Sequence, residues 1–238
     1  MSSIQVGARF AKLNIFPLNQ VFATFVKNKI VYRLFFLLIF NIYFGQKNEY
    51  FSDSKTAIKA NQYKIEITQN NNSKKPVVYF NLYRKSSKKW LKIQSGNFTK
   101  ESTSLYVTTD EDLNNDGYND LKISFAQAAR GANEIEKLLI FNPKLQKLIE
   151  IVNSQEYPNL HYNSKRNCIN SYMFSGSNTT LFFKLRNNKL ENFAKVEFYN
   201  DSVYSYKIKK NQEILLKKRT YQSSDAAIFF SDFDPITE

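Results

Sequence analysis

The chain is poor in the two side chains that most often carry out nucleophilic catalysis. Among its 238 residues there is one cysteine, Cys168, and one histidine, His161. A single cysteine excludes an internal disulfide. An activated nucleophile needs a base beside it, and no known catalytic signature surrounds either residue. The sequence therefore predicts that the protein is not an enzyme and that His161 has a structural or surface role.

Acidic residues are missing from the first 48 positions, and Glu49 is the first of them. In this stretch three basic residues precede an apolar run over 34–44, which is the pattern of a secretory signal peptide. The run is shorter than the roughly 20 residues of a transmembrane helix. We expect a signal peptide over 26–45 and an over-extended gene start over 1–25; the alternative is a buried N-terminal helix. No cysteine follows the run to carry a lipid, so we expect a periplasmic or extracellular protein that does not span the membrane.

Short strand signals recur along the remaining chain, which we expect to form one domain over 46–238. Tyr63, Ile65 and Ile67 alternate with polar residues, as in a strand with one buried face. Residues 46–60 are polar and predict a lead-in segment, and 126–134 fit either a short helix or a loop. Further runs typical of strands occupy 77–83, 89–93, 137–141, 148–151, 171–174, 180–185, 193–198, 202–209 and 213–220. This pattern predicts a mainly β protein, an antiparallel two-layer β-sandwich.

Positive charge is in excess, at +13 for the whole chain. Loss of residues 1–45, with five basic and no acidic residues, would lower it to +8. Such a balance indicates an anionic partner or simply a self-repelling surface. The basic stretches 84–90, 207–210 and 217–219 raise nucleic-acid binding, with Trp90 able to stack on a base. The secretory signal argues against it, and solvated strand faces are the expected explanation.

Nine residues, 112–120, have the spacing of a calcium-binding loop with a glycine at position 6. Calcium prefers six to eight oxygen ligands, which alternate residues of a tight loop can supply. Five of the 21 acidic residues lie within eleven positions here, and crowded carboxylates repel one another unless a cation is present. The predicted calcium ligands are the side chains of Asp112, Asn114, Asp116 and Asp120 and the carbonyl of Tyr118.

Residues 112–120 must also be weighed against other kinds of loop and site. An EF-hand would need glutamate at position 12, which is Ile123. The flanking residues 105–109 and 121–125 favour strands, so the loop is expected to join two antiparallel strands. A metal-free polar turn would use the same Asp, Asn and Gly residues. A glycosidase pair of carboxylates is disfavoured because carboxylates bound to calcium cannot also transfer protons.

The same loop resembles the Asp-x-Asn-x-Asp-Gly-x-x-Asp loop of FG-GAP and VCBS repeats, although its single occurrence argues against a propeller. A wider resemblance, to uncharacterised secreted proteins of Bacteroidota, covers about 105–200. It rests on the loop and on the stretches 129–134, 139–144, 157–160, 162–163, 167–169 and 175–180. More distantly, the loop and the Phe-Asn-Pro-Lys strand end resemble the periplasmic immunity protein of the Xanthomonas antibacterial type IV secretion system and the invertebrate-type lysozyme inhibitors. That resemblance implies a calcium-containing β-sandwich that blocks a peptidoglycan hydrolase.

Inhibitors of this type present a Ser-Gly loop to the cleft of the hydrolase. The corresponding turn in this chain is Ser175, Gly176, Ser177 and Asn178, for which a plain hairpin turn is the alternative. We therefore expect a calcium-binding protein that binds a protein partner, as an inhibitor or immunity factor against a cell-wall hydrolase. A structural or adhesive module of the cell envelope, with calcium as a scaffold, is the alternative. Because the chain is basic, a neutral or acidic hydrolase is the expected target.

Overall fold

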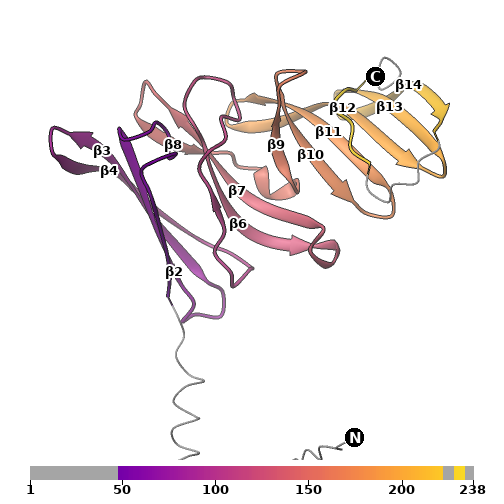
Figure 1. The fold of residues 1–238 in the computed structure, drawn as a ribbon. Helices are drawn as coiled ribbons and strands as arrows, with labels where there is room; N and C mark the ends of the chain where they lie inside the picture. The colour runs from indigo at the N-terminus through magenta and orange to yellow at the C-terminus, as the bar shows by residue number, and fades with distance from the viewer. Residues whose placement is uncertain (1–47, 222–227, 234–238) are drawn as a thin grey trace, which may run out of the picture. The chain divides into compact units, whose positions relative to one another are not determined.

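The computed structural model describes residues 48–221 and 228–233 of the chain (Figure 1). The predicted gene start, 1–25, and signal peptide, 26–45, lie outside these residues. Contacts divide the chain into two units, Met1–Gln46 and Lys47–Glu238, and all strands described below belong to the second. No helix in the described part of the chain is both long and apolar enough to cross a membrane.

Antiparallel strands make up nearly all of the regular structure. The described residues contain fourteen strands and two short 3₁₀ turns. Every paired strand runs antiparallel to its neighbour. The mainly β, antiparallel prediction is therefore confirmed. The span 126–134, expected to be a short helix or a loop, is instead the tip of a β-hairpin: one strand continues to Ala128, another begins at Asn133, and a 3₁₀ turn, Ala129–Gly131, joins them.

The first sheet has the order β1-β2-β3-β4, with strands Glu49–Asp53, Tyr63–Asn70, Val77–Ser86 and Lys89–Thr99. In β2, Tyr63, Ile65 and Ile67 are buried and alternate with partly exposed polar residues, as predicted. The predicted lead-in over 46–60 is wrong, because β1 lies within it and pairs with β2. A short, polar edge strand leaves little periodic signal in a sequence.

The second sheet has the order β5-β6-β7-β8, with strands Val107–Thr108, Leu121–Ala128, Asn133–Asn142 and Lys147–Glu150. Both faces of β7 are buried. Leu139 and Phe141 join a core with the apolar face of the first sheet. Leu138 and Ile140, on the opposite face, join a second core with strands of the third sheet. The second sheet is thus covered on both faces.

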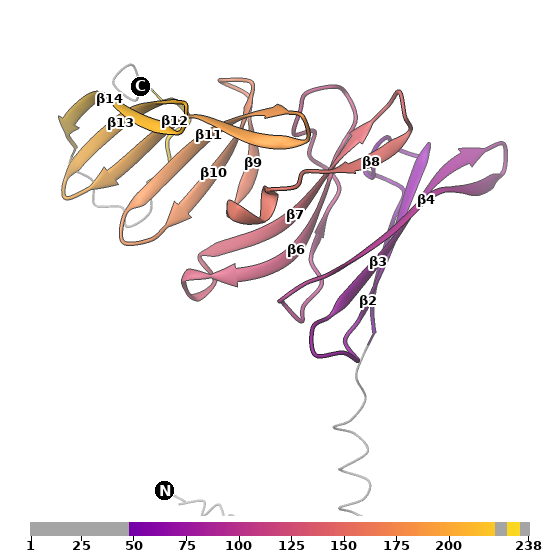
Figure 2. The same ribbon diagram turned by 180° about the vertical axis from the view of Figure 1, so that it is seen from behind.

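The third sheet has six strands in the order β9-β10-β11-β12-β13-β14 (Figure 2). In that order their bounds are Leu160–Asn163, Cys168–Phe174, Asn178–Arg186, Lys189–Tyr199, Ser202–Lys209 and Gln212–Thr220. One face packs on the second sheet through Leu181 and Phe183. The other face carries Phe182, Ala194 and Val196. All its neighbours are consecutive strands, so it is a simple meander.

The predicted two-layer sandwich is replaced by three sheets. The physical reason lies in β7, whose residues 138–141 are all apolar and all buried. A continuous apolar run is typical of a strand covered on both faces, whereas a strand of a two-layer sandwich alternates apolar and polar residues. The second sheet can therefore pack against a sheet on either side.

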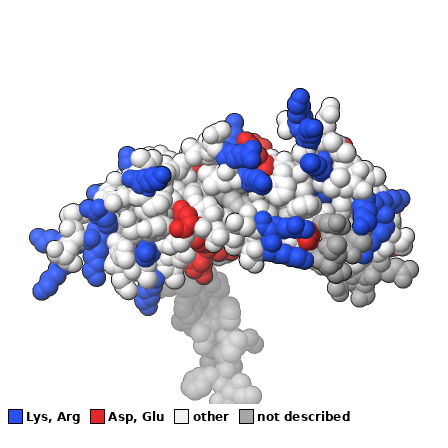
Figure 3. Space-filling view, turned by 90° about the horizontal axis from the view of Figure 1, so that it is seen from above, with Lys and Arg blue, Asp and Glu red and all other residues white. Residues whose placement is uncertain are grey.

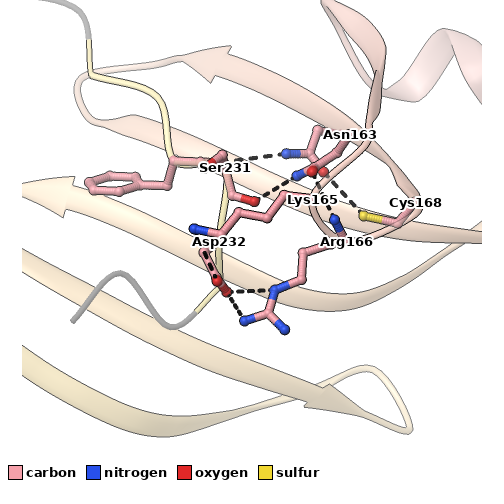
Figure 4. A network of polar contacts seen from close by, with 8 residues as sticks. Asn163, Lys165, Arg166, Cys168, Ser231 and Asp232 are labelled. Carbon is pink, nitrogen blue, oxygen red and sulfur yellow. Dashed lines mark hydrogen bonds and ion pairs between the residues drawn. The ribbon is translucent and has the colours of Figure 1, made fainter. Parts of the chain in front are cut away.

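The C-terminal segment 228–233 covers the free face of the third sheet. Ile228 and Phe230 are buried in the core on that face. Figure 4 shows how polar contacts hold the segment: Asn163 donates to the Ser231 carbonyl at 2.8 Å, and the Arg166 side chain donates to the Asp232 carboxylate, 2.7 Å from Nε. Asp232 is 2% exposed, and this pairing compensates its buried charge.

Candidate functional site

The acidic loop, residues 110–120, connects β5 to β6 in the second sheet. The two strands pair antiparallel, with Val107 opposite Ile123 and Thr108 opposite Lys122. This confirms that the loop joins antiparallel strands. Position 12 of the motif, Ile123, is fully buried in the first core and takes no part in the loop.

Side chains of the acidic loop bind its own backbone. The Asp112 carboxylate accepts hydrogen bonds from Asp116 N at 3.1 Å and Gly117 N at 2.7 Å. Asn114 Oδ1 also accepts from Asp116 N, at 3.2 Å, and Asp116 Oδ1 accepts from Tyr118 N at 3.0 Å. Gly117 has a φ of +86°, which glycine adopts without strain. These bonds hold the oxygens of Asp112, Asn114 and Asp116 around one tight turn.

Asp120, the last predicted ligand, anchors the loop to the sheet. It is 2% exposed, and its two carboxylate oxygens accept hydrogen bonds from Leu113 N at 2.8 Å and Phe141 N at 2.9 Å. Burial raises the pKa of Asp120 to about 7, helped by the Asp116 and Asp112 carboxylates and opposed by the two backbone N–H groups. The side chain therefore fixes the end of the loop against β7.

The oxygen donors of the loop match calcium in their chemistry, since they are carboxylate, amide and backbone oxygens. Each carboxylate oxygen that accepts one N–H keeps a second lone pair. However, no three His, Cys, Asp or Glu side chains in the described ranges lie close enough to hold a metal by themselves. A cation here would need Asn114 Oδ1 and the Tyr118 carbonyl in addition to the carboxylates.

The acidic loop also contacts the connection between β1 and β2 of the first sheet. Asn119 donates from its backbone to the Ile58 carbonyl and from its side chain to the Thr56 carbonyl, both at 2.8 Å. The Tyr118 ring packs on Phe141, with ring centroids 5.4 Å apart. The loop therefore links two sheets, which its sequence alone did not indicate.

A second carboxylate, Asp53, organises that neighbouring segment and was missed in the sequence. Asp53 accepts hydrogen bonds from the backbone N–H groups of Lys55, Thr56 and Ala57, at 2.9, 3.1 and 2.7 Å. The Thr56 and Thr109 hydroxyls also donate to it. Burial would raise the pKa of Asp53, but the hydrogen bonds outweigh it and lower the pKa to about 2. The available signal was an Asp followed three residues later by Thr, typical of a side-chain-capped turn.

A buried lysine next to the acidic loop was also missed. Lys122 lies 3.0 Å from the Glu111 carboxylate and 3.4 Å from that of Glu136, and it donates to the Leu160 carbonyl at 2.8 Å. Burial alone would lower the pKa of Lys122, but the two carboxylates raise it. Because Leu160 belongs to β9, this network joins the second sheet to the third.

The predicted partner loop, Ser175–Asn178, connects β10 to β11. Ser177 Oγ donates to Glu197 at 3.0 Å, and Ser175 N donates to the Ser177 carbonyl at 3.2 Å. Gly176 has a φ of +79° and no atom within 4 Å of where a Cβ would lie. Beside the loop is a hollow of about 330 Å³, lined also by residues 198–200. The four predicted residues thus form one braced turn with an open tip.

His161 and Cys168 have structural surroundings. The His161 ring packs on Tyr172 in a tilted arrangement, with centroids 4.2 Å apart, and Nδ1 lies 3.2 Å from the Asn159 carbonyl. Burial lowers the pKa of His161 and raises the pKa of the Cys168 thiol to about 11. A thiol with such a pKa is a poor nucleophile at neutral pH. Both residues therefore serve the packing of the third sheet.

Comparisons with known proteins found a distant likeness among solved structures. No family model matches the chain, and no curated protein matches it. The chain is similar to a solved structure described as a Xanthomonas type IV secretion system related protein. The two are 10% identical, the match covers 73% of this chain and 95% of the other, and the TM-score is 0.46. A likeness at this level transfers neither a site nor an activity to this chain.

Proposed function

We propose that the protein is a secreted, calcium-binding, non-enzymatic protein that inhibits a peptidoglycan hydrolase, as an inhibitor or immunity factor. The proposal starts from the distant resemblance, which rests on the loop 112–120 and the Phe-Asn-Pro-Lys strand end, and from the secretory pattern over 26–45. The observation that carries it is the braced, open turn Ser175–Asn178, because such a turn can enter a cleft with little loss of conformational freedom. The packed positions of His161 and Cys168 also support a role in binding and not in catalysis.

In this proposal calcium stabilises the acidic loop and does not meet the partner. Asp112, Asn114 and Asp116 would hold the ion with the Tyr118 carbonyl and Asp120. A bound ion supplies positive charge, which offsets the repulsion between the carboxylates. The hydrogen bonds that the backbone N–H groups of Asp116 and Gly117 donate to Asp112 pre-form the turn, so little chain must be ordered when the ion binds.

The partner loop can be tested with two matched glycines. Gly176 and Gly131 both have positive φ, +79° and +93°, and both have open space where a Cβ would lie. Tryptophan at either site therefore causes similar backbone strain, about 1–2 kcal/mol. We expect Gly176→Trp to abolish inhibition and Gly131→Trp to leave it unchanged.

The assay follows cell-wall hydrolysis by a panel of bacterial toxin hydrolases and lysozymes, with and without the purified protein in 1 mM calcium. Thermal unfolding of both variants with calcium and with chelator controls for misfolding. Equal inhibition by the two variants would remove the loop from the interface. If no hydrolase in the panel is inhibited, the inhibitor proposal is wrong.

The second candidate is a structural or adhesive module of the cell envelope. The contacts that favour it are those that tie the sheets together around the acidic loop: Asn119 to the Ile58 carbonyl, and Lys122 to the Leu160 carbonyl. An ion at this position would act as a scaffold for the whole unit. This candidate predicts calcium-dependent stability together with no inhibition of any hydrolase.

A further inference from the structure

A basic groove lies at one end of the third sheet, beside the tips of the β11–β12 and β13–β14 hairpins. Its volume is about 1080 Å³, and we define it by its cations, Lys184, Arg186, Lys189, Lys207, Lys209 and Lys210, with Glu191 as the one carboxylate in its lining. All six cations are exposed. Figure 3 shows Lys and Arg prevailing over Asp and Glu on one face of the molecule.

The strand register places the cations on β11, β12 and β13 on one face. Lys184 and Arg186 follow Phe182 at intervals of two, so they share its face. Arg186 lies directly opposite Lys189, and Lys207 directly opposite Ala194, a residue of the same core. The basic groove therefore continues the face that the C-terminal segment covers, and Phe233 of that segment borders it.

Within the protein the positive charge of the groove is poorly compensated. Glu191 lies 3.6 Å from Arg186, but both side chains are more than half exposed, so the pair contributes little. No ion pair to any described residue is formed by Lys189, Lys207, Lys209 or Lys210. Like charges opposite each other on neighbouring strands, such as Arg186 and Lys189, destabilise a sheet. An anionic ligand would offset that repulsion.

Apolar side chains also line the groove. Phe193, Ala194 and Phe233 pack in the core on the same face as the cations, whereas Tyr157 and Leu190 pack in the core on the opposite face. The aromatic rings are already used in packing: Phe193 contacts Phe182 and Phe233, and Tyr157 lies 4.5 Å from Phe183 between ring centroids. Rings held in this way are not free to stack on bases, which is how proteins hold single-stranded nucleic acid. A ligand with both carboxylate and apolar side chains matches cations and apolar lining together.

We propose that the basic groove is a docking site for an acidic, extended segment of a protein partner, with apolar side chains between its carboxylates. This inference goes beyond the proposed function and does not depend on it. The groove lies at the opposite end of β11 from the Ser175–Asn178 loop. The nine residues of β11 span about 27 Å at roughly 3.3 Å per residue, so the two sites are separate.

The test measures binding of a fluorescent twelve-residue peptide of alternating glutamate and leucine, by anisotropy, to the purified full chain at 50 mM NaCl. A glutamate–serine peptide and a single-stranded oligothymidylate of equal charge are the comparison probes. The glutamate–leucine peptide should bind at least about tenfold more tightly than either, because only it can fill the apolar lining. Salt at 300 mM should weaken its binding, since the groove charges are exposed.

The double variant Lys184→Glu/Lys207→Glu reverses two exposed charges of the groove. It should weaken peptide binding by about tenfold or more, because like charges would then face each other. The matched control Lys88→Glu/Lys89→Glu makes the same change of net charge at the exposed β3–β4 turn and should alter binding less than about threefold.

Three results would contradict the proposal. Equal losses in the two double variants would mean attraction by net charge and no groove. Tighter binding of the oligothymidylate would mean a nucleic-acid surface. A chain ending at Phe233 should bind the peptide as the full chain does. Binding seen only after that truncation would make residues 234–238 the occupant of the groove.

Discussion

Asp53 and Asp120 are both carboxylates that accept hydrogen bonds from the backbone, yet they differ in burial, in the number of hydrogen bonds they accept and in pKa. Asp53 is half-buried, receives five hydrogen bonds and has a pKa of about 2. Asp120 is fully buried, receives two and has a pKa of about 7. The difference shows that the number of donors, weighed against burial and neighbouring charge, decides whether a buried carboxylate keeps its charge. The acidic loop is therefore fixed at its last residue by Asp120, a carboxyl group whose charged form is disfavoured by burial and by the neighbouring carboxylates.

The largest expected effect is that of Asp120→Ala. The change leaves Leu113 N and Phe141 N buried without their acceptor, and each unsatisfied group costs about 1–3 kcal/mol. We expect the free energy of unfolding to fall by about 3–5 kcal/mol, measured by urea unfolding at pH 7. A loss below about 1 kcal/mol would mean that Asp120 does not anchor the loop to β7.

Lys100 extends the comparison to a buried cation whose hydrogen-bond partners are uncharged. It is 0% exposed and donates to the Ser104 carbonyl at 2.6 Å and to Ser124 Oγ at 2.9 Å. Burial lowers the pKa of Lys100 to about 8, against the weaker effect of Glu49 and Glu134. Between pH 8 and about 10.5 the unfolded chain binds the proton and the folded chain does not, so stability contributed by this group rises with pH.

The expected rise is about 3 kcal/mol across that range, at 1.36 kcal/mol per pKa unit. It should be read as the difference between the wild type and Lys100→Met in urea unfolding at pH 7.5 and pH 10. The subtraction removes the tyrosines, which titrate in both proteins. Parallel curves for the two proteins would show that Lys100 keeps its ordinary pKa.

Asp53→Ala is expected to have a smaller effect than Asp120→Ala. The Asp53 carboxylate accepts hydrogen bonds within an exposed turn, so water can replace part of the hydrogen bonding that is lost. We expect the free energy of unfolding to fall by about 1–2 kcal/mol. The pKa of Asp53 is lowered in the folded state, so its contribution is present above pH 4 and is lost as the pH falls towards 2. The stability difference between wild type and variant, measured at pH 6 and pH 2.5, should shrink at the lower pH. A constant difference would contradict the lowered pKa.

The parts of the fold that repeat locally could be predicted from the sequence, and the parts that depend on distant partners could not. The alternation at Tyr63, Ile65 and Ile67 gave the buried face of β2 correctly. The Asp-Asn-Gly spacing gave the loop between β5 and β6. The three-sheet arrangement could be predicted only if the apolar run over 138–141 was interpreted as a strand buried on both faces. The turn that Asp53 caps has a local signal, but its link to Thr109 could not be predicted, because Thr109 lies more than fifty residues further along the chain.

The candidate site divides in the same way. Local hydrogen bonds of Asp112, Asn114 and Asp116 follow from their spacing. The contact of Asp120 with Phe141 and the pairing of Glu111 with Lys122 depend on how strands pair within the second sheet. Of the basic groove, only the stretch 207–210 stood out in the sequence, because it is the strand register that brings Lys184 and Lys207 to one face.

Calcium-dependent unfolding tests the central claim, that the acidic loop binds calcium, most directly. At 1 mM calcium and a dissociation constant of about 0.1 mM, binding adds about 1.4 kcal/mol to the free energy of unfolding. The account predicts that the melting temperature of the wild type is higher in calcium than in chelator. Asp116→Ala should remove this difference, with only a small loss in chelator from the hydrogen bond that Tyr118 N donates to Asp116. Equal melting temperatures of the wild type in calcium and in chelator, or an equal loss for Asp116→Ala in both conditions, would make the loop a metal-free turn.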